Sequence, residues 1–429
     1  MKRAIMNETI SIVGLGYVGL PLAVLASRKN YRVVGIDTDP KKILSLNKKL
    51  LLLKGKKLSG DLKTSHSFAS LDFRNIKQSS IIIICVPTPV DENFVPNLEP
   101  ICNACKLIAP FLQKSQLVIL ESTVNPGVSE DIIKPILEEL SGLKCGRDFY
   151  LAHCPERINL GDNYWTVENI ARVVGATDDE GLAKAVNFYR SIIDAEIKEM
   201  NTIKEAEAVK IVENSFRDIN IAFVNELAMS FDNLGIDVVN VINGAATKPF
   251  AFMPHYPGCG VGGHCIPIDP YYLIDHAKKN GFTHDLLIAA RKINNYMPSY
   301  TVEKVIRFLE NEEINVEGTK VTVLGLSYKP DVEDDRESPS YEIIEQLKKR
   351  GFMISSFDPF NIHKSTAKSL QKALLNTKVV IVATAHGEFK SLTPEYLLGF
   401  GVMAVIDGRN CLNKLEFDNS DLKYLGIGR

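Results

Sequence analysis

The sequence predicts an α/β protein in which two Rossmann-like, doubly wound domains are joined by a long central helix. A short β-branched strand runs directly into the glycine-rich turn GLGYVG at residues 14–19, and an apolar helix follows. After residue 315, apolar strands and amphipathic helices alternate a second time. Between these halves, residues 201–235 have helical spacing and contain no proline, and their only glycine is Gly235, where the helix should end. We place the three domains at residues 1–200, 201–312 and 313–429.

The composition is that of a globular enzyme. The 429 residues suggest two or three domains at ~150 residues each. Hydrophobic residues make up 45%, charged residues 24%, and the formal net charge is -2, so no global positive field favours a nucleic-acid or membrane-surface partner. No apolar run reaches the ~20 residues of a membrane span or resembles a signal peptide. We therefore expect a cytoplasmic protein.

Eight cysteines are scattered along the chain without a secretory signal, which predicts reduced thiols rather than a disulfide framework. Residues 102–105, CNAC, resemble half of a zinc ribbon, but a second CxxC is missing. The surrounding residues 98–112 have the pattern of an amphipathic helix in which both cysteines pack in the core. We expect no metal site.

The first strand, at residues 9–13, and its turn have the order of a dinucleotide-binding fingerprint. Gly14 permits the tight turn, Gly16 lets backbone approach a pyrophosphate, and Gly19 allows close packing of helix and strand. The expected cofactor contacts in this turn are Gly14, Gly16, Tyr17, Val18 and Gly19.

The end of the second strand, at residues 31–37, indicates which dinucleotide binds. Asp37 lies about 20 residues beyond the fingerprint, where a carboxylate accepts a hydrogen bond from the ribose 2′-hydroxyl and repels a 2′-phosphate. Asp39 follows closely and no arginine does, so the pattern favours NAD over NADP, unless Asp37 only closes a turn. Two further buried strands end near Thr88 and Thr123, which would lie at the ligand-binding edge of the sheet or be ordinary loop residues.

The second half has lost the GxGxxG spacing, but its strand-to-helix loop carries Lys329 and Arg336. This favours a different phosphate-bearing ligand, the alternative being a solvated charged loop. On the central helix, Lys210 and Asn214 stand four residues apart and share one face. A helix of this length, on the order of 45–50 Å, could also provide a dimer surface, and we expect a homodimer or a higher homo-oligomer.

Residues 257–270, PGCGVGGHCIPIDP, combine a glycine- and proline-fixed loop with a thiol and a carboxylate. We interpret Cys265 as a nucleophile, because a thiolate that adds to a carbonyl forms a tetrahedral adduct with a transferable hydride. An inert buried cysteine is the alternative. Thiol chemistry beside NAD predicts oxidation of an aldehyde to a thioester, whose hydrolysis needs a base, Asp269 or Glu156. Lys210 and Asn214 could stabilise the oxyanion.

Several long motifs resemble the UDP-sugar 6-dehydrogenase family, in order and spacing and over essentially the whole chain: GLGYVG, Asp37, VPTP, EST, CPER, EAVKIVENSFRDINIAFVNELA, GVGGHCIPIDPYYL and GLSYKPDVEDDRESPS. The resemblance implies two NAD-dependent oxidations that convert a sugar C6 alcohol into a carboxylate through a cysteine thiohemiacetal and a thioester. It also implies an NAD-binding first domain, a central dimerisation domain with the catalytic loop, and a UDP-sugar-binding last domain.

The resemblance assigns roles residue by residue. It places the nucleophile on Cys265, water positioning on Thr123, and the other catalytic groups on Lys210, Asn214, Asp269 and Glu156. It places NAD contacts outside the fingerprint on Asp37, Thr88, Thr123 and Arg336. It places UDP-sugar contacts on Glu156, Arg157, Lys210, Asn214, Gly260, Gly262, Gly263, Lys329 and Arg409.

One departure bears on the sugar. UDP-glucose dehydrogenases usually carry a second glutamate shortly after the proline–glutamate pair, whereas this chain reads PERINLGD, with no acid until Asp162. Together with GHCIPIDPYYL, this resembles the branch that oxidises UDP-N-acetylhexosamines. The stretch TKPFAFMPHYPGCG most resembles the UDP-N-acetylglucosamine enzymes, although Cys259 stands where that branch usually has proline. The alternatives are the UDP-N-acetylmannosamine, UDP-N-acetylgalactosamine or UDP-glucose substrate, a two-electron hydroxyacid dehydrogenase, an NAD-sensing protein without turnover, or a redox-sensor role for Cys265.

Overall fold

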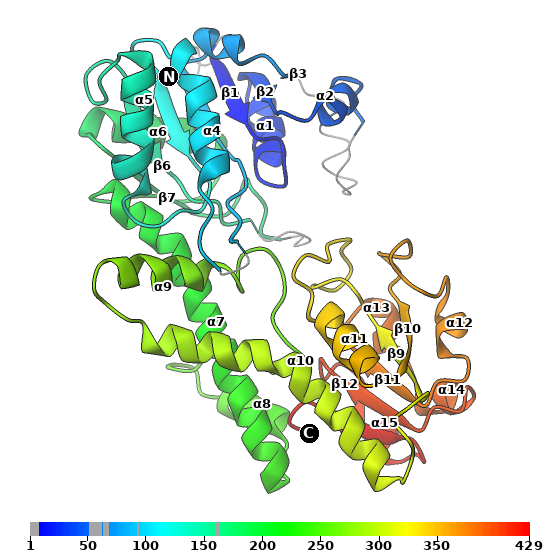
Figure 1. Cartoon of the computed structure of the whole chain (residues 1–429). Helices are drawn as coiled ribbons and strands as arrows, with labels where there is room; N and C mark the ends of the chain where they lie inside the picture. The colour runs from blue at the N-terminus through cyan, green and yellow to red at the C-terminus, as the bar shows by residue number, and fades with distance from the viewer. Residues whose placement is uncertain (1–7, 51–61, 63–67, 92–93, 159–163) are drawn as a thin grey trace. The chain divides into compact units, whose positions relative to one another are not determined.

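The computed structural model describes residues 8–50, 62, 68–91, 94–158 and 164–429 (Figure 1). The chain divides into two compact units, which we describe separately: residues 1–213 with 271–280, and residues 214–270 with 281–429. Each unit contains one of the two predicted sheets. The domain limits at residues 200 and 312 remain our proposal, in which the central domain, residues 201–312, contributes to both units.

The first unit is built on a sheet with the strand order β3-β2-β1-β4-β5-β6-β7-β8 in the described residues. Its strands are β1 (Thr9–Val13), β2 (Arg32–Ile36), β3 (Phe68–Ser70), β4 (Ile81–Ile84), β5 (Leu117–Leu120), β6 (Tyr150–His153), β7 (Arg172–Ala176) and β8 (Ile197–Glu199). The strands β1 to β6 are parallel, whereas β7 runs antiparallel to β6. The order 3-2-1-4-5-6 is that of a dinucleotide-binding domain, which confirms the predicted fold class.

The apolar run of β4 shows why this sheet is buried on both faces. Ile81 and Ile83 pack with helices α1 (Gly19–Arg28) and α6 (Asp179–Ile192). Ile82 and Ile84 pack on the other face with α4 (Glu99–Ile108) and α5 (Lys134–Ser141). Alternate side chains of a strand point to opposite faces, so four consecutive isoleucines require helices on both sides.

The second unit contains a parallel sheet with the order β10-β9-β11-β12-β13 in the described residues. The strands are β9 (Lys320–Leu324), β10 (Met353–Phe357), β11 (Val379–Val382), β12 (Ala404–Asp407) and β13 (Lys423–Gly426). Helices α10 (Asp285–Asn311) and α11 (Pro339–Lys349) pack on one face, as Figure 1 shows. The other face carries α12 (Leu370–Leu374), α13 (Gly387–Lys390), α14 (Pro394–Leu398) and α15 (Lys414–Asp418). This second doubly wound sheet was also predicted.

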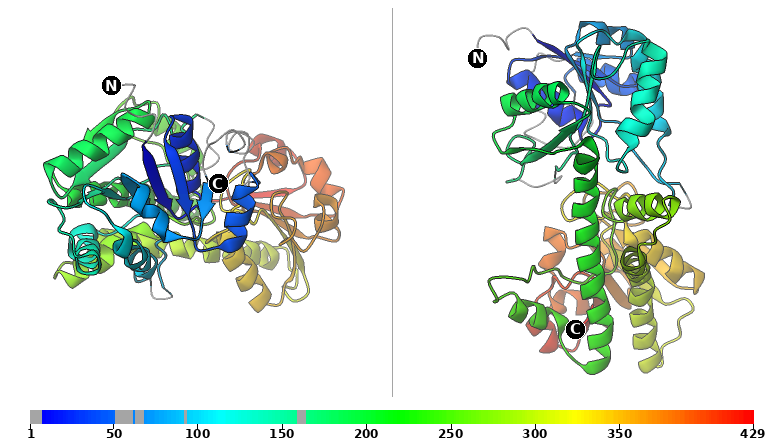
Figure 2. Two further views of the ribbon diagram at one scale, coloured as in Figure 1. Left: turned by 90° about the horizontal axis from the view of Figure 1, so that it is seen from above. Right: turned by 90° about the vertical axis from the view of Figure 1, so that its left-hand side faces the viewer.

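The predicted central helix is α7 (Ile203–Leu234), one uninterrupted helix of 32 residues (Figure 2). It ends before Gly235, whose φ of +66° is the left-handed conformation that glycine adopts beyond a helix C-terminus. In the second unit its apolar residues Val224 and Ala228 pack with α8 (Val238–Ala245) and α10. Because α7 begins in the first unit and ends in the second, it contributes predicted site residues to both.

The cysteines of α4 are only partly as predicted. Cys105 is fully buried, but Cys102 is partly exposed, because it lies at the edge of the buried face of the helix. Within the described ranges, no cluster of three or more histidine, cysteine or acidic residues could hold a metal ion. Among the helices that the structure describes, none combines the length and apolar character needed to cross a membrane.

Candidate active site

The GLGYVG turn connects β1 to α1, and its glycines are required for three different reasons. Gly14 has a φ of +94°, and a Cβ on Gly19 would lie 2.0 Å from the carbonyl oxygen of Gly14. A Cβ on Gly16 would meet no atom within 4 Å, so the backbone there is open to a ligand. This open backbone at a helix N-terminus fits a pyrophosphate.

Asp37 follows β2 and is 9% exposed. Its carboxylate accepts hydrogen bonds from the backbone N–H of Leu15 at 2.9 Å and of Asp39 at 3.0 Å, and from Lys42 Nζ at 2.7 Å. Burial raises the pKa of Asp37, but the Lys42 and backbone hydrogen bonds outweigh burial, so the pKa lies below its usual value. Lys42, on α2 (Pro40–Asn47), was not among the predicted residues, because a lysine five residues after Asp37 is not part of the dinucleotide fingerprint.

Replacing Asp37 by alanine should lower kcat/KM for NAD about tenfold to a hundredfold, the cost of losing a hydrogen bond to a charged group. Lys42 would then remain beside the ribose position, so use of NADP should rise. Lys42→Ala in the Asp37→Ala background should remove this gain, whereas the same change at the exposed Lys41 should not. Initial rates with both cofactors measure this. Equal efficiency of NAD and NADP in the parent would contradict the assignment.

The loops after β4 and β5 emerge at the same edge of the sheet, because these parallel strands pair with Ile84 opposite Leu120. Ser122 joins the two loops by donating to the carbonyl of Val86 at 2.7 Å. Thr88 is buried, and its carbonyl accepts from the hydroxyl of Tyr272 at 2.8 Å. Thr123 is partly exposed. The first unit therefore brings both predicted threonines to its ligand-binding edge.

Glu156 follows β6 and is buried. One carboxylate oxygen accepts the backbone N–H groups of Arg157 and Ile158, and the other lies 2.9 Å from Nη2 of Arg172. Arg172 is fully buried in β7, and Glu121 lies on its other side at 3.9 Å. These contacts fix the direction of the Glu156 carboxylate.

Glu121 and Arg172 were not among the predicted site residues. Burial raises the pKa of Glu121 to about 7, against the opposing effect of the Arg172 charge. The Glu121 carboxylate also accepts a hydrogen bond from the hydroxyl of Tyr189. In the sequence, Glu121 begins the EST motif and Arg172 begins the otherwise apolar strand β7, but neither position indicates that the two side chains meet.

The side chain of Arg157 is held by the protein. Its guanidinium forms a two-pronged pair with Glu213 of α7, and Nη1 donates to the carbonyl of Ala171 at 2.8 Å. Lys210, one turn earlier on α7, is partly exposed. The predicted contact of Arg157 with a substrate stays a prediction, but the structure already explains its orientation.

In the second unit, Cys265 lies at the turn that leads into α9 (Asp269–Lys279). Its carbonyl accepts from the backbone N–H of Ile268 at 3.0 Å and of Asp269 at 2.8 Å. Asp269 is buried, and its carboxylate accepts a hydrogen bond from Nδ2 of Asn214, which is also buried. Asp269, the predicted base, is therefore in direct contact with Asn214, one of the two predicted oxyanion-binding residues. Asp269 lies four residues after Cys265, the predicted nucleophile.

The glycines of the cysteine loop are packed against protein. A Cβ on Gly260 would lie 2.7 Å from Pro339, one on Gly262 2.7 Å from the carbonyl of Glu337, and one on Gly263 2.8 Å from the ring of Tyr328. Gly260 and Gly263 also have φ of +134° and +93°. We predicted these glycines as substrate contacts. Close packing is a sufficient reason for glycine at these positions, and backbone contacts with a sugar stay a prediction.

The predicted phosphate loop of the second unit also contacts the cysteine loop. Gly263 donates its N–H to the carbonyl of Arg336 at 3.0 Å. Arg409 donates from Nε to the carbonyl of Ala383 at 2.8 Å and from Nη1 to the carbonyl of Gly260 at 3.2 Å. Burial, helped by the charge of Arg336, lowers the pKa of His264, next to Cys265. Two predicted residues of the second unit, Arg336 and Arg409, thus contact the cysteine loop directly.

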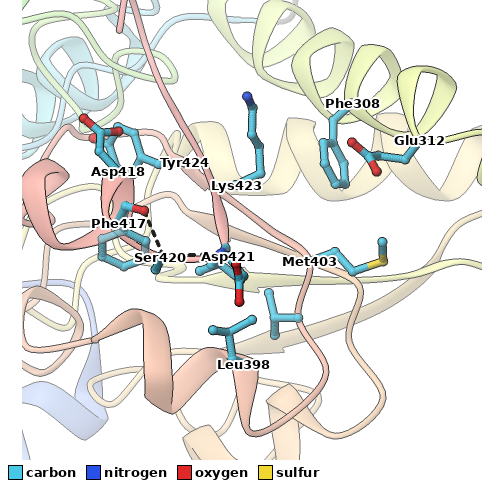
Figure 3. Close-up of a pocket in the computed structure, with 12 residues that line it drawn as sticks. Phe308, Glu312, Leu398, Met403, Phe417, Asp418, Ser420, Asp421, Lys423 and Tyr424 are labelled. Atoms are coloured by element: carbon cyan, nitrogen blue, oxygen red, sulfur yellow. Dashed lines mark hydrogen bonds between the residues drawn. The ribbon is translucent and has the colours of Figure 1, made fainter.

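A separate pocket of about 450 Å³ lies at the amino ends of β12 and β13 (Figure 3). Glu312, Asp418 and Asp421 line it together with Lys423 and several apolar side chains. None of the predicted site residues borders it, and three carboxylates would repel a phosphate. This pocket is therefore a poor candidate for a phosphate site. The predicted ligand residues Lys329, Arg336 and Arg409 lie at the other, carboxyl edge of the sheet, and their contacts with a ligand stay a prediction.

Known protein families and solved structures are similar to this chain over most of its length. Profiles of the UDP-glucose/GDP-mannose dehydrogenase family match its NAD-binding domain to residues 8–193, its central domain to residues 204–296 and its UDP-binding domain to residues 322–414. Protein CapL of Staphylococcus aureus is 37% identical, covering 91% of this chain and 93% of CapL. UDP-N-acetyl-D-glucosamine 6-dehydrogenase of Pseudomonas aeruginosa is 35% identical, covering 97% and 96%. The solved structure of a UDP-D-ManNAc dehydrogenase from Pyrococcus horikoshii is similar, with a TM-score of 0.92, 33% identity, and coverage of 98% and 99%.

Proposed function

The chain belongs to the UDP-glucose/GDP-mannose dehydrogenase family, and from this premise we propose that it oxidises the C6 alcohol of a UDP-N-acetylhexosamine, preferably UDP-N-acetylglucosamine, to the uronic acid. Membership makes it an NAD-dependent oxidoreductase that acts on the CH–OH group of a UDP-sugar. The observation that carries the proposal is the contact between Asn214 and Asp269 at the turn that holds Cys265.

The proposed reaction removes four electrons in two steps. NAD, when bound, supplies a hydride acceptor for each oxidation. In the first step the C6 alcohol loses a hydride and a proton and becomes an aldehyde. The Cys265 thiolate then adds to the carbonyl carbon, and the thiohemiacetal loses the second hydride to become a thioester. Water cleaves the C–S bond, so that the acid leaves and the Cys265 thiol is regenerated.

The surrounding groups have complementary roles in this proposal. The amide of Asn214 has two N–H donors; Asp269 takes one, and the other would bind the developing oxyanion together with the ammonium of Lys210. Asp269 would accept a proton from the attacking water. Thr123 and Glu156 would position that water and the sugar, and the restraint of Glu156 by Arg172 and two backbone N–H groups supports such a fixed role.

The choice among sugars rests on the sequence. The missing glutamate falls in PERINLGD, of which residues 159–162 lie outside the described residues. The similar proteins include dehydrogenases named for UDP-N-acetyl-D-glucosamine and for UDP-N-acetyl-D-mannosamine, so the family leaves the configuration at C2 open.

NADH formation with UDP-glucose, UDP-N-acetylglucosamine and its manno and galacto epimers tests the proposed substrate. We expect the highest kcat/KM with UDP-N-acetylglucosamine. Preference for an epimer would correct only the sugar, and faster turnover of UDP-glucose would contradict our interpretation of the missing glutamate. Oxidation of a simple hydroxyacid and of none of these nucleotide sugars would favour the two-electron alternative.

An apolar surface of the second unit supports a homodimer. Phe216 and Phe223 of α7 are about half exposed, and Phe250, Met253 and Tyr256 are 49–67% exposed. His255 packs edge-on against Phe216, so this segment lies beside α7. Large apolar side chains that are exposed on neighbouring segments are typical of an interface. We propose that a second copy of the chain covers this surface, which sedimentation would detect as twice 47.6 kDa.

A further inference from the structure

We propose that His386 is a positioning residue for substrate binding: it fixes the substrate loop, residues 327–336, which carries Lys329 and Arg336. The inference rests on the proposed role of Lys329 in binding the UDP-sugar. His386 follows β11, is fully buried, and was not among the predicted site residues. Its two ring nitrogens join a fixed carboxylate, Asp358, to the backbone of the loop.

Asp358 occupies in the second sheet the place that Asp37 occupies in the first. Gly14 N–H donates to the carbonyl of Ile36 and Leu15 N–H donates to Asp37, at 2.8 and 2.9 Å. The corresponding bonds run from Gly325 to Phe357 and from Leu326 to Asp358, at 2.9 and 2.7 Å. In both halves an acid at the end of the second strand therefore holds the loop after the first strand.

Asp37 and Asp358 differ in their exposure and in their further hydrogen-bond partners. Asp358 is completely buried and also accepts from the N–H and hydroxyl of Ser327 and from the N–H groups of Phe360 and Asn361. Ser327 stands at the position that corresponds to Gly16 in the first sheet. Its hydroxyl donates a hydrogen bond to Asp358. A ribose cannot reach this carboxylate, so ligand binding falls to the rest of the substrate loop.

His386 connects this carboxylate to the loop. Its Nδ1 accepts from the backbone N–H of Asp331 at 2.9 Å, so the ring proton lies on Nε2, which donates to Asp358 at 3.1 Å. The ring also stacks on Phe360, with centroids 5.1 Å apart. These contacts fix both the tautomer and the orientation of the imidazole ring.

The backbone of Asp331, to which His386 binds, has an unfavourable conformation. Asp331 lies two residues after Lys329 and has a φ of +58°, which is unfavourable for a residue other than glycine. Its carboxylate accepts the N–H of Gly387 at 3.0 Å. Because the His386 and Gly387 bonds hold this conformation, losing the first should release Lys329 from its fixed place in the loop.

Two substitutions separate the two bonds of His386. In His386→Gln the amide reaches the position of Nε2 and can still donate to Asp358, but the acceptor for Asp331 N–H is lost. In His386→Asn the amide oxygen takes the position of Nδ1 and keeps the loop bond, but the bond to Asp358 is lost. If His386 positions the loop, the glutamine variant should be the more impaired in substrate binding.

The experiment measures kcat, KM for UDP-N-acetylglucosamine, KM for NAD, melting temperature, and calorimetric binding of UDP to the full chain. We expect His386→Gln to raise KM for the sugar nucleotide and Kd for UDP about tenfold. KM for NAD should change less than about twofold, because Arg336, the predicted NAD contact of this loop, is held separately by Asp334 and by the N–H of Gly263. His386→Asn should change both by less than about threefold. His363→Gln, the same change at an exposed histidine of this unit, should match the parent.

The inference is overturned if His386→Gln binds UDP like the parent, or if both variants lose UDP affinity and NAD affinity together with stability, the result of a structural role. If the parent oxidises no UDP-N-acetylhexosamine but binds UDP, the UDP titration still decides this inference while the proposed function fails. A parent that does not bind UDP contradicts both.

A second variant covers the case in which His386→Gln does not fold. Gly387→Pro removes the N–H that bonds Asp331, and proline is favoured at the first position of a helix such as α13. The preceding His386 has φ −60° and ψ 149°, which a following proline allows. We expect weaker binding of UDP by about threefold to tenfold. Unchanged UDP affinity in this variant would also overturn the inference.

Discussion

Replacing Cys265 by alanine should reduce acid formation on the order of 10⁴-fold or more, the loss seen when a catalytic nucleophile is removed. Without the thiol, no thiohemiacetal forms, and the hydrate of the aldehyde is left as a poor substrate for the second oxidation. NAD binding should be nearly unchanged, because Cys265 belongs to the second unit and the dinucleotide fingerprint to the first. Product masses and a titration with NAD measure the two effects.

The matched control for Cys265→Ala is Cys102→Ala. Cys102 is also partly exposed, but it lies on α4, away from every predicted site residue in the sequence. This control should keep the rate of the parent. An alanine variant at Cys265 that still forms the acid at the parent rate would remove the thiol from the mechanism.

Replacing Asp269 by asparagine should slow turnover about 10²- to 10⁴-fold, because general-base assistance to the water would be lost. The oxidations precede hydrolysis, so a first burst of about two NADH per Cys265 should survive, and the thioester should accumulate. Asparagine has the shape of aspartate and its oxygen can still accept from Asn214, so the fold should be retained. Rapid mixing and the mass of the intact protein detect the burst and the adduct.

Asp275→Asn on the same helix is the control for Asp269→Asn. Asp275 pairs with Lys279, one turn away, and has no role in the proposed chemistry. It should leave the rate unchanged. Steady-state turnover at the parent rate in Asp269→Asn would assign the base elsewhere, and Glu156 would be the next candidate.

The sequence predicted the regular parts of the fold because they depend on local patterns. The strand at residues 9–13 and the helix α7 are where periodicity and Gly235 placed them. The short strands β3 and β8, of three residues each, were not predicted, since so short a segment has no measurable alternation. The antiparallel pairing of β7 with β6 was also missed, because pairing direction has no local signal.

The site residues that belong to a local sequence motif were predicted. Those whose role depends on a contact with a residue elsewhere in the sequence were missed. Gly14, Gly16 and Gly19 have the geometry that the fingerprint requires. Arg172 and His386 gave no comparable signal, because their significance depends on Glu156 and on Asp358, each distant in the sequence. Asp269 was predicted to act beside Cys265, but its contact with Asn214 needed the fold.

The central claim is that Cys265 captures the aldehyde so that both oxidations occur before the product leaves. The most direct test is the amount of NADH formed per UDP-N-acetylglucosamine consumed, with the product identified by mass. We expect a ratio of two and the uronic acid as product. A ratio of one, with a released aldehyde or ketone, would contradict it and return the protein to the two-electron dehydrogenases.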